Sequence, residues 1–198
     1  MATLSPGFAD PVLAAQATFR GVMDAVARPC TVVPLIDTPA APPPLCAAAA
    51  AIALTLFDHD APVWLDPPLA QVSDVAAWIR FHTGAPIVTE PAVAAFALVS
   101  DPAGLRPFRD FAAGTLENPD TSATLILQVT TLEDGPALDF IGPGVAGRAT
   151  LRAAPLPNGF AEQIIANRAL FPRGVDLLFA TRGSVAALPR SATLVGEV

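Results

Sequence analysis

The stretch Leu125-Ile-Leu-Gln-Val129 is almost entirely apolar, and it decides the class of fold. A strand with one face in water alternates apolar and polar residues, whereas a continuous apolar run is typical of a strand covered on both faces. The run over residues 175–180 has the same character. Two strands of this kind predict a sheet buried inside an α/β domain.

Helices are predicted on either side of these strands along the chain. Asp10 can cap a helix that begins at Pro11, because its carboxylate accepts hydrogen bonds from the first free N–H groups. Further helices are expected at residues 45–57, 72–81 and 160–169. In the first helix, apolar residues recur at helical spacing at Val12, Ala15, Phe19, Val22, Met23 and Val26.

Short strands are predicted between the helices, at residues 31–35, 62–65, 86–88, 95–99, 137–141 and 185–188. Pro34 places the first of them at a sheet edge, since proline has no N–H to donate. Residues 137–141 are expected to pair with the strand at 125–129, and residues 185–188 to form a hairpin with the strand before them. Helices alternate with strands early and strands cluster late, which predicts one α/β domain over residues 1–198 with a layered, mixed sheet.

Composition narrows the classes of function. The chain has 198 residues, of which 53% are apolar and 15% charged, so it is expected to fold around a core and to bury some surface against another chain. The net charge is −7 and the sequence contains no lysine. Without lysine there is neither a Schiff base to pyridoxal phosphate nor a Walker-A phosphate loop. An acidic chain of this kind is not expected to bind nucleic acid or an anionic membrane.

The cysteines and the first residues indicate the compartment. Cys30 and Cys46 lack the CxxC spacing of a metal site and lie among apolar or small residues, so both are expected to be buried, reduced thiols. Residues 1–6 lack a basic and apolar export signal, and the apolar run 45–57 is too short to cross a bilayer. These features predict a cytoplasmic protein.

The segment Arg80-Phe-His-Thr-Gly-Ala-Pro86 is the strongest candidate for a ligand site, and it is expected to form a turn between a helix and a strand. Arg80 and Thr83 suit phosphate oxygens, His82 can exchange a proton near neutral pH, and Gly84 permits close backbone approach. The alternative is that His82 only caps the helix or fills the core, bonded to a backbone carbonyl. The sequence by itself favours this structural role for His82.

Other charged residues allow two interpretations each. Asp58 and Asp60 flank His59 and could bind a metal, but a turn in which Asp58 bonds its own backbone is favoured. Arg20 and Arg190 each either pair with an internal acid, such as Asp176, or face a partner chain, where arginine is enriched.

Several segments, taken in their order along the chain, resemble the PhnH family, whose members are subunits of the bacterial carbon–phosphorus lyase core complex. They are Gln16, Phe19 and Arg20; Asp58, Asp60, Pro62 and Trp64; residues 80–86; Pro172, Gly174 and Asp176; and Pro189 with Arg190. The resemblance implies a three-layer sandwich like the large domain of pyridoxal-phosphate-dependent transferases, without that cofactor or any other. It also implies a homodimer in isolation and, in the cell, the other core subunits as partners.

In the family, the core complex is associated with transfer of methylphosphonate to the ribose of ATP. This chain lacks the cysteine cluster of an iron–sulfur subunit, so it is not the lyase itself. No catalytic residue and no metal ligand are carried over from the family. Arg20, Asp58, Asp60 and Arg190 lie in the matching segments and are taken as candidate partner-interface residues.

Three functions remain open. The chain is an accessory subunit that binds partners and a phosphonate or nucleotide; or an independent transferase that uses His82 and Arg80; or a dimeric structural domain without a ligand. The first is adopted as the hypothesis.

Overall fold

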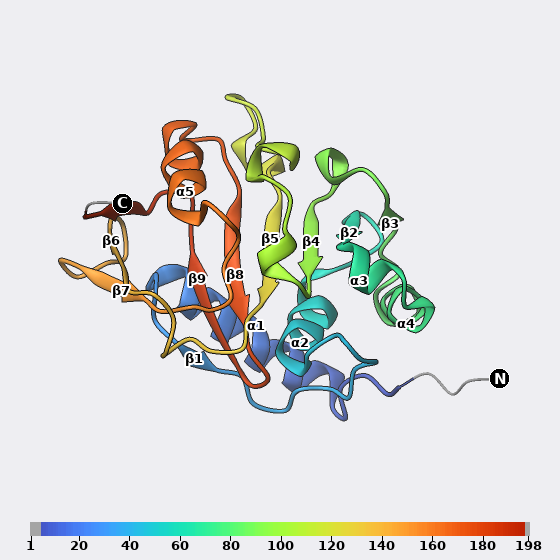
Figure 1. The fold of residues 1–198 in the computed structure, drawn as a ribbon. Coiled ribbons are helices and arrows are strands. Elements are labelled where there is room, and N and C mark those ends of the chain that lie inside the picture. The colour runs from blue at the N-terminus through green and yellow to red at the C-terminus, as the bar shows by residue number, and fades with distance from the viewer. Residues whose placement is uncertain (1–4, 197–198) are drawn as a thin grey trace.

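Seven strands form one mixed sheet in the order β1-β9-β8-β5-β4-β2-β3 (Figure 1). The computed structural model describes residues 5–196, so the prediction about an export signal in residues 1–6 falls mostly outside the described residues. Strands β3, β2, β4, β5 and β8 run parallel to one another. Strand β9 is antiparallel to β8, and β1 is antiparallel to β9. The bounds are β1 Val33–Pro34, β2 Val63–Leu65, β3 Ile87–Val88, β4 Phe96–Val99, β5 Thr124–Gln128, β8 Asp176–Ala180 and β9 Ser184–Leu188.

Both faces of this sheet are covered, as the apolar runs predict. Helices α1 (Pro11–Ala27), α2 (Ala47–Leu56), α3 (Pro67–Ala70) and α4 (Ser73–Thr83) contribute to a first core on one face. Helix α5 (Phe160–Ala169) and a three-stranded sheet contribute to a second core on the other face. Figure 1 shows α5 in front of β8 and β9, with α1 behind them.

The side chains of the central strands alternate between the two cores. Along β8, Leu178 packs in the first core, whereas Leu177 and Phe179 pack in the second. Ile126 and Leu127 divide in the same way on β5. The α/β class and the mixed sheet are therefore confirmed.

The predicted pairing of residues 137–141 with the central strand is wrong. Strand β6 (Leu138–Ile141) instead pairs with β7 (Ala149–Leu151) and β10 (Thr193–Val195) in a separate sheet of order β10-β6-β7. The physical reason is that β5 already has β4 on one side and β8 on the other, so no hydrogen-bonding edge is left. The small sheet covers the second core instead, through Phe140 and Leu151.

Helix α1 begins where the sequence predicts, but its apolar face points outward. The Asp10 carboxylate accepts hydrogen bonds from Val12 and Leu13 N–H groups. The residues of α1 that are buried against the sheet and α2 are Ala14, Thr18, Val22 and Ala25. Most of the apolar residues whose spacing predicted the helix lie on the opposite, exposed side: Val12, Phe19, Met23 and Val26.

The remaining elements agree with the sequence in type and order. Helix α4 buries Val75, Trp78 and Ile79, and β9 forms the predicted hairpin with β8. Pro34 lies on the edge strand β1. Helix α3, β7 and β10 were not predicted. Among residues 5–196, no helix has the length and apolar character needed to span a membrane.

Candidate functional site at the carboxyl edge of the sheet

A cavity of about 890 Å³ lies at the edge where the parallel strands end. Figure 1 shows β4, β5 and β8 pointing to this edge, beside α2. The cavity is within the size range of small-molecule sites. Its lining comes mainly from residues just beyond the ends of the parallel strands and from the start of α2, including Cys46, Pro68, Ser100, Asp101, Gln128, Thr131, Glu133, Thr181 and Arg182.

The topology explains why a cavity forms here. After β2 the chain enters α3 and α4, whose Leu69 and Trp78 belong to the first core. After β4 it enters short 3₁₀ helices, and Phe108 and Phe111 from this segment belong to the second core. Neighbouring parallel strands whose connections leave on opposite faces create a crevice at their carboxyl ends, where ligands bind in many α/β proteins.

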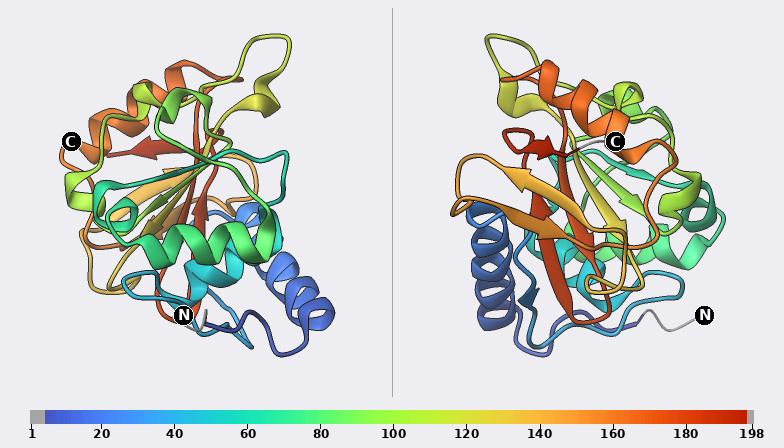
Figure 2. Two further views of the ribbon diagram at one scale, coloured as in Figure 1. Left: turned by 90° about the vertical axis from the view of Figure 1, so that its right-hand side faces the viewer. Right: turned by 60° about the vertical axis from the view of Figure 1, so that its left-hand side comes forward.

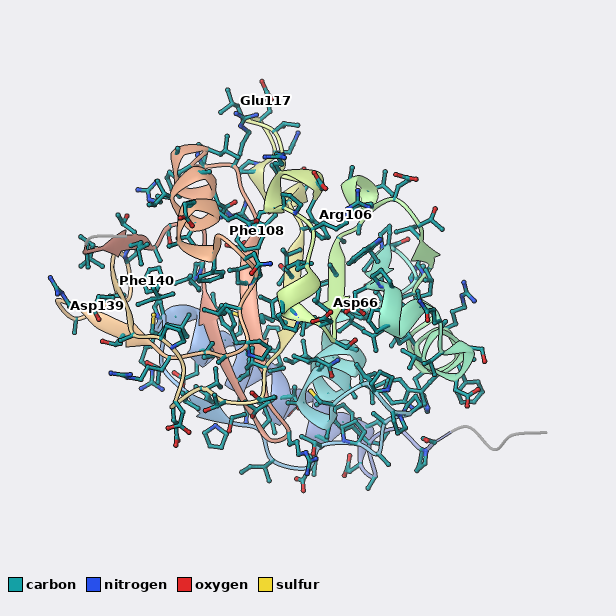
Figure 3. The ribbon with its side chains drawn as sticks, in the orientation of Figure 1. Asp66, Arg106, Phe108, Glu117, Asp139 and Phe140 are labelled. Carbon is teal, nitrogen blue, oxygen red and sulfur yellow. The ribbon has the colours of Figure 1, made fainter. Side chains whose placement is uncertain are left out.

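Asp66, directly after β2, fixes the shape of this edge (Figure 3). Its carboxylate accepts hydrogen bonds from the N–H groups of Leu69 (3.2 Å), Ser100 (2.7 Å) and Asp101 (2.8 Å), and from the Ser100 hydroxyl at 3.1 Å. The side chain is buried, and this burial raises the pKa of Asp66, although the hydrogen bonds oppose the shift. The carboxylate thereby holds the ends of β2 and β4 together.

The sequence contained a signal for this residue. Asp66 precedes Pro67 and caps α3 just as Asp10 precedes Pro11 and caps α1. The second Asp–Pro pair is a weaker signal because it starts a helix of only four residues, Pro67–Ala70.

Gln128 performs a similar task at the end of β5. It is only 8% exposed; its Oε1 accepts a hydrogen bond from the Cys46 N–H, and its buried Nε2 has no hydrogen-bond acceptor within residues 5–196. Cys46 is the residue before α2, and its thiol donates to the carbonyl oxygen of Thr181 at 3.1 Å. Burial raises the pKa of the Cys46 thiol. These contacts join β5, α2 and the turn after β8 in one wall of the cavity.

Gln128 could have been found from the sequence, since it is the one polar residue in the run 125–129. A buried amide in an otherwise apolar strand needs hydrogen-bond partners, and it therefore marks a place where the chain is organised around polar groups. Both cysteines are free thiols; Cys30 is buried, as expected, whereas Cys46 is only partly buried.

The predicted ligand segment lies elsewhere, and its first part is helical. Arg80, His82 and Thr83 belong to the last turn of α4, so the expected turn begins only at Gly84, which has φ +74°. The Thr83 hydroxyl donates to the carbonyl oxygen of Ile79 at 2.8 Å. None of the four predicted residues lines the edge cavity.

His82 takes up the contacts that its structural interpretation predicts. Its Nε2 lies 3.1 Å from the carbonyl oxygen of Ser5, and its ring packs at 4.9 Å from that of Trp78 and 5.0 Å from that of Phe81. Arg80 is exposed. The C-terminus of a helix carries partial negative charge, which disfavours a phosphate on the helix axis.

The turn that contains Asp58 and Asp60 lies beside this helix end. The Asp58 carboxylate accepts a hydrogen bond from the Asp60 N–H at 2.9 Å, so the predicted turn is confirmed. A Cβ atom added at Gly84 would lie 3.7 Å from the Cβ of His59, which shows how closely the two segments approach. Within residues 5–196, no group of three or more potential metal ligands is found.

Arg20 and Arg190 have different surroundings. Arg190 pairs with Asp176 through Nη2 and Oδ2 at 2.5 Å, and its Nη1 donates to the carbonyl oxygen of Pro119 at 2.5 Å. Of the two interpretations left open for Arg190, the pairing with Asp176 is present in the structure. Arg20, in contrast, is exposed on α1, next to the outward apolar face.

Fold and site together define a mixed α/β domain with a ligand-sized cavity at the carboxyl edge of its sheet. The chain belongs to the PhnH family of bacterial phosphonate metabolism proteins, whose sequence profile matches residues 6–195.

Two relatives extend this match. The alpha-D-ribose 1-methylphosphonate 5-triphosphate synthase subunit PhnH of Rhizobium meliloti (strain 1021) is 45% identical over 194 residues, which cover 98% of this chain and 96% of that protein. HtxG of Stutzerimonas stutzeri, a proposed C-P lyase subunit protein, is 30% identical over 176 residues, covering 89% of this chain and 83% of that protein.

Replacing Asp66 with alanine is expected to lower the free energy of unfolding by about 3 kcal/mol, because three backbone N–H groups lose their acceptor. Urea unfolding measures this. Asp74, in the first turn of α4, gives the matched control, and Asp74→Ala is expected to change stability by less than about 0.5 kcal/mol. Equal stability of the two variants would show that Asp66 does not hold the edge.

Replacing Arg190 with alanine is expected to cost about 2 kcal/mol, since it leaves the half-buried Asp176 carboxylate without its cation. Arg148 pairs with Asp139 at 3.2 Å on the surface, so Arg148→Ala is expected to cost under about 0.5 kcal/mol. Chemical denaturation of both variants checks the difference. An Arg190→Ala protein as stable as Arg148→Ala would contradict the structural role of Arg190.

Proposed function

We propose that this chain is an accessory subunit of an α-D-ribose 1-methylphosphonate 5-triphosphate synthase and acts in bacterial phosphonate catabolism. The observation that carries the proposal is the 45% identity to such a subunit over almost the full length of both chains. The likeness to HtxG and the family match over residues 6–195 point to the same pathway. In this proposal the chain binds the other synthase subunits in the cytoplasm and contributes to transfer of the phosphonate without catalysing it alone.

The finer features implied by the family belong to the same proposal. The isolated chain forms a homodimer, uses no cofactor, and has the three-layer arrangement of the large domain of pyridoxal-phosphate-dependent transferases. The absence of lysine from the sequence supports the lack of pyridoxal phosphate, because no amine is available for the Schiff base.

The outer face of α1 is the best candidate for the surface that meets another subunit. Val12, Phe19, Met23 and Val26 are 65%, 48%, 49% and 37% exposed, and their spacing places them in one stripe along the helix. Figure 2 shows α1 at the periphery of the domain. A contiguous exposed apolar stripe on a chain with so few charged residues favours burial against another protein.

Arg20 adds a charged group to this face. It is three residues from Met23, so the two side chains are neighbours on the helix surface. An exposed arginine at the border of an apolar stripe is a typical composition for a protein–protein interface. Arg20 therefore remains a proposed interface residue, together with Asp58 and Asp60, whose side chains are also exposed, and the partly exposed Arg190.

Charge placed in the α1 stripe is expected to prevent assembly. The variant carrying Phe19→Glu and Met23→Glu should fold but lose at least 90% of its co-purification with the other synthase subunits, because two carboxylates cannot be desolvated in an apolar contact. Ile165→Glu is the control, since Ile165 lies on helix α5 and is 50% exposed. Affinity purification after co-expression measures both.

Full assembly of the double variant would exclude the α1 face as the contact. Failure of the unaltered chain to co-purify with any synthase subunit would contradict the accessory function itself. Circular dichroism and urea unfolding of each variant establish that lost assembly does not reflect lost folding.

The alternative of an independent transferase is tested at α4. His82→Ala and Arg80→Ala are expected to leave turnover of the assembled synthase within about twofold of the wild-type rate, because the His82 ring packs on Trp78 and Arg80 lies outside the edge cavity. Turnover is followed as adenine release from ATP and methylphosphonate. Intact assembly with a rate reduced a hundredfold or more would favour the transferase.

A further inference from the structure

We propose that the cavity at the carboxyl edge of the sheet binds a phosphorylated sugar, with its phosphate toward α2 and its hydroxyl groups toward β4. The proposal deepens the proposed function, on which the choice of a pentose rests.

The phosphate end is defined by hydrogen-bond donors from three elements. Gln128 ends β5, and its buried Nε2 has no acceptor within the part of the chain that the structure describes. Cys46 lines the cavity and precedes the ten-residue helix α2, so the positive end of that helix is directed toward the same wall. Arg182 follows Thr181, whose carbonyl oxygen accepts from the Cys46 thiol, and it is the one cation in the lining.

These donors converge because the strands that carry them are neighbours. Strands β5 and β8 pair in parallel with Gln128 opposite Ala180, and Arg182 lies two residues beyond that pair. The Gln128 Oε1 is already occupied by the Cys46 N–H, which orients the amide and leaves only its nitrogen to seek an acceptor. A ligand oxygen at this wall supplies that acceptor and the anion that Arg182 and the helix terminus favour.

The opposite part of the lining carries acceptors. Asp101 follows β4, and Glu133 lies in the segment after β5; both line the cavity. The backbone N–H of Asp101 donates to Asp66, but the carboxylates of Asp101 and Glu133 are not part of the Asp66 hydrogen bonds. The Asp66 carboxylate is occupied by backbone donors and does not count toward ligand binding. Carboxylates repel a second phosphate but accept hydrogen bonds from hydroxyl groups, so the wall favours a sugar over a polyphosphate alone.

The test uses the isolated chain and Cys46 as a reporter, because this thiol lies in the cavity wall. Alkylation by iodoacetamide is followed by mass spectrometry in the presence of ribose 5-phosphate, ribose or inorganic phosphate at equal concentrations. We expect ribose 5-phosphate to slow Cys46 alkylation at least fivefold and the other two to slow it less than twofold. Cys30 is the internal control, since it is buried and burial raises its pKa to about 12.

Variants locate the effect. Arg182→Ala and Gln128→Leu are expected to abolish protection, whereas Arg80→Ala, which removes an exposed arginine away from the cavity, should retain it. Arg182 is exposed, so its variant keeps the proposal testable if Gln128→Leu fails to fold. Titration calorimetry with the same three probes measures binding independently of the thiol.

Each outcome has one meaning. Protection by ribose 5-phosphate that is lost in Arg182→Ala supports the site. Equal protection by inorganic phosphate overturns the sugar part, and no binding of ribose 5-phosphate in either assay overturns the proposal. Co-purification with the synthase subunits is measured separately, so intact assembly without ribose 5-phosphate binding rejects this site and leaves the accessory function standing.

Discussion

Both faces of β5 and β8 have to be covered by a single short chain, and the rest of the architecture follows from this constraint. Leu178 and Ile126 turn to one face, while Leu177, Phe179 and Leu127 turn to the other. Apolar side chains on both faces leave no surface that water can solvate, so each face needs its own layer. The chain supplies α1 to α4 for the first face, and α5 with a small sheet for the second.

The same constraint accounts for the unusual use of α1. It packs on β9, β1 and α2 through small or short side chains, among them Ala14, Thr18 and Ala25. Small residues let a helix approach its neighbours closely, but they bury little area themselves. The larger apolar residues of α1 are left on its outer face, where their burial requires a surface from another molecule.

At the carboxyl edge, two buried polar side chains serve backbone groups that the sheet leaves without partners. The Asp66 carboxylate receives N–H groups from two segments, and Gln128 receives the N–H that precedes α2. Buried polar groups of this kind are stable only when their partners are held in place, so they make the edge rigid. Asp66 uses its oxygens fully, whereas Gln128 keeps an unused donor at the cavity wall.

Much of the fold could be predicted because its signals are local. The Asp10 cap, the alanine-rich α2 and the apolar strands each act within a few residues, and they appear where expected. The pairing of β6 could not be predicted, since it depends on whether β5 has a free edge. Periodicity in α1 likewise predicts a helix but does not show which molecule covers each face.

The candidate site was harder to predict than the fold for a related reason. Arg80, His82 and Thr83 are close in sequence and share chemistry suited to phosphate. In the structure, however, the Thr83 hydroxyl bonds a carbonyl oxygen of its own helix and the His82 ring lies against the carbonyl oxygen of Ser5. The cavity instead combines residues that are far apart along the chain, such as Cys46, Gln128 and Arg182. Only strand order brings them together, and strand order is a property of long-range pairing.

Helix α2 lies between α1, which carries the exposed apolar stripe, and the cavity at the carboxyl edge of the sheet. Its residues from Ala48 to Ala53 are fully buried, with α1 on one side and the sheet on the other, while Cys46 at its start faces the cavity. The exposed α1 side chains Val12, Phe19, Met23 and Val26 are not among the residues that line the cavity. Substitutions at distant sites without shared partners act additively. Assembly and ligand binding can consequently be altered one at a time in this domain, even though a single buried helix supports both.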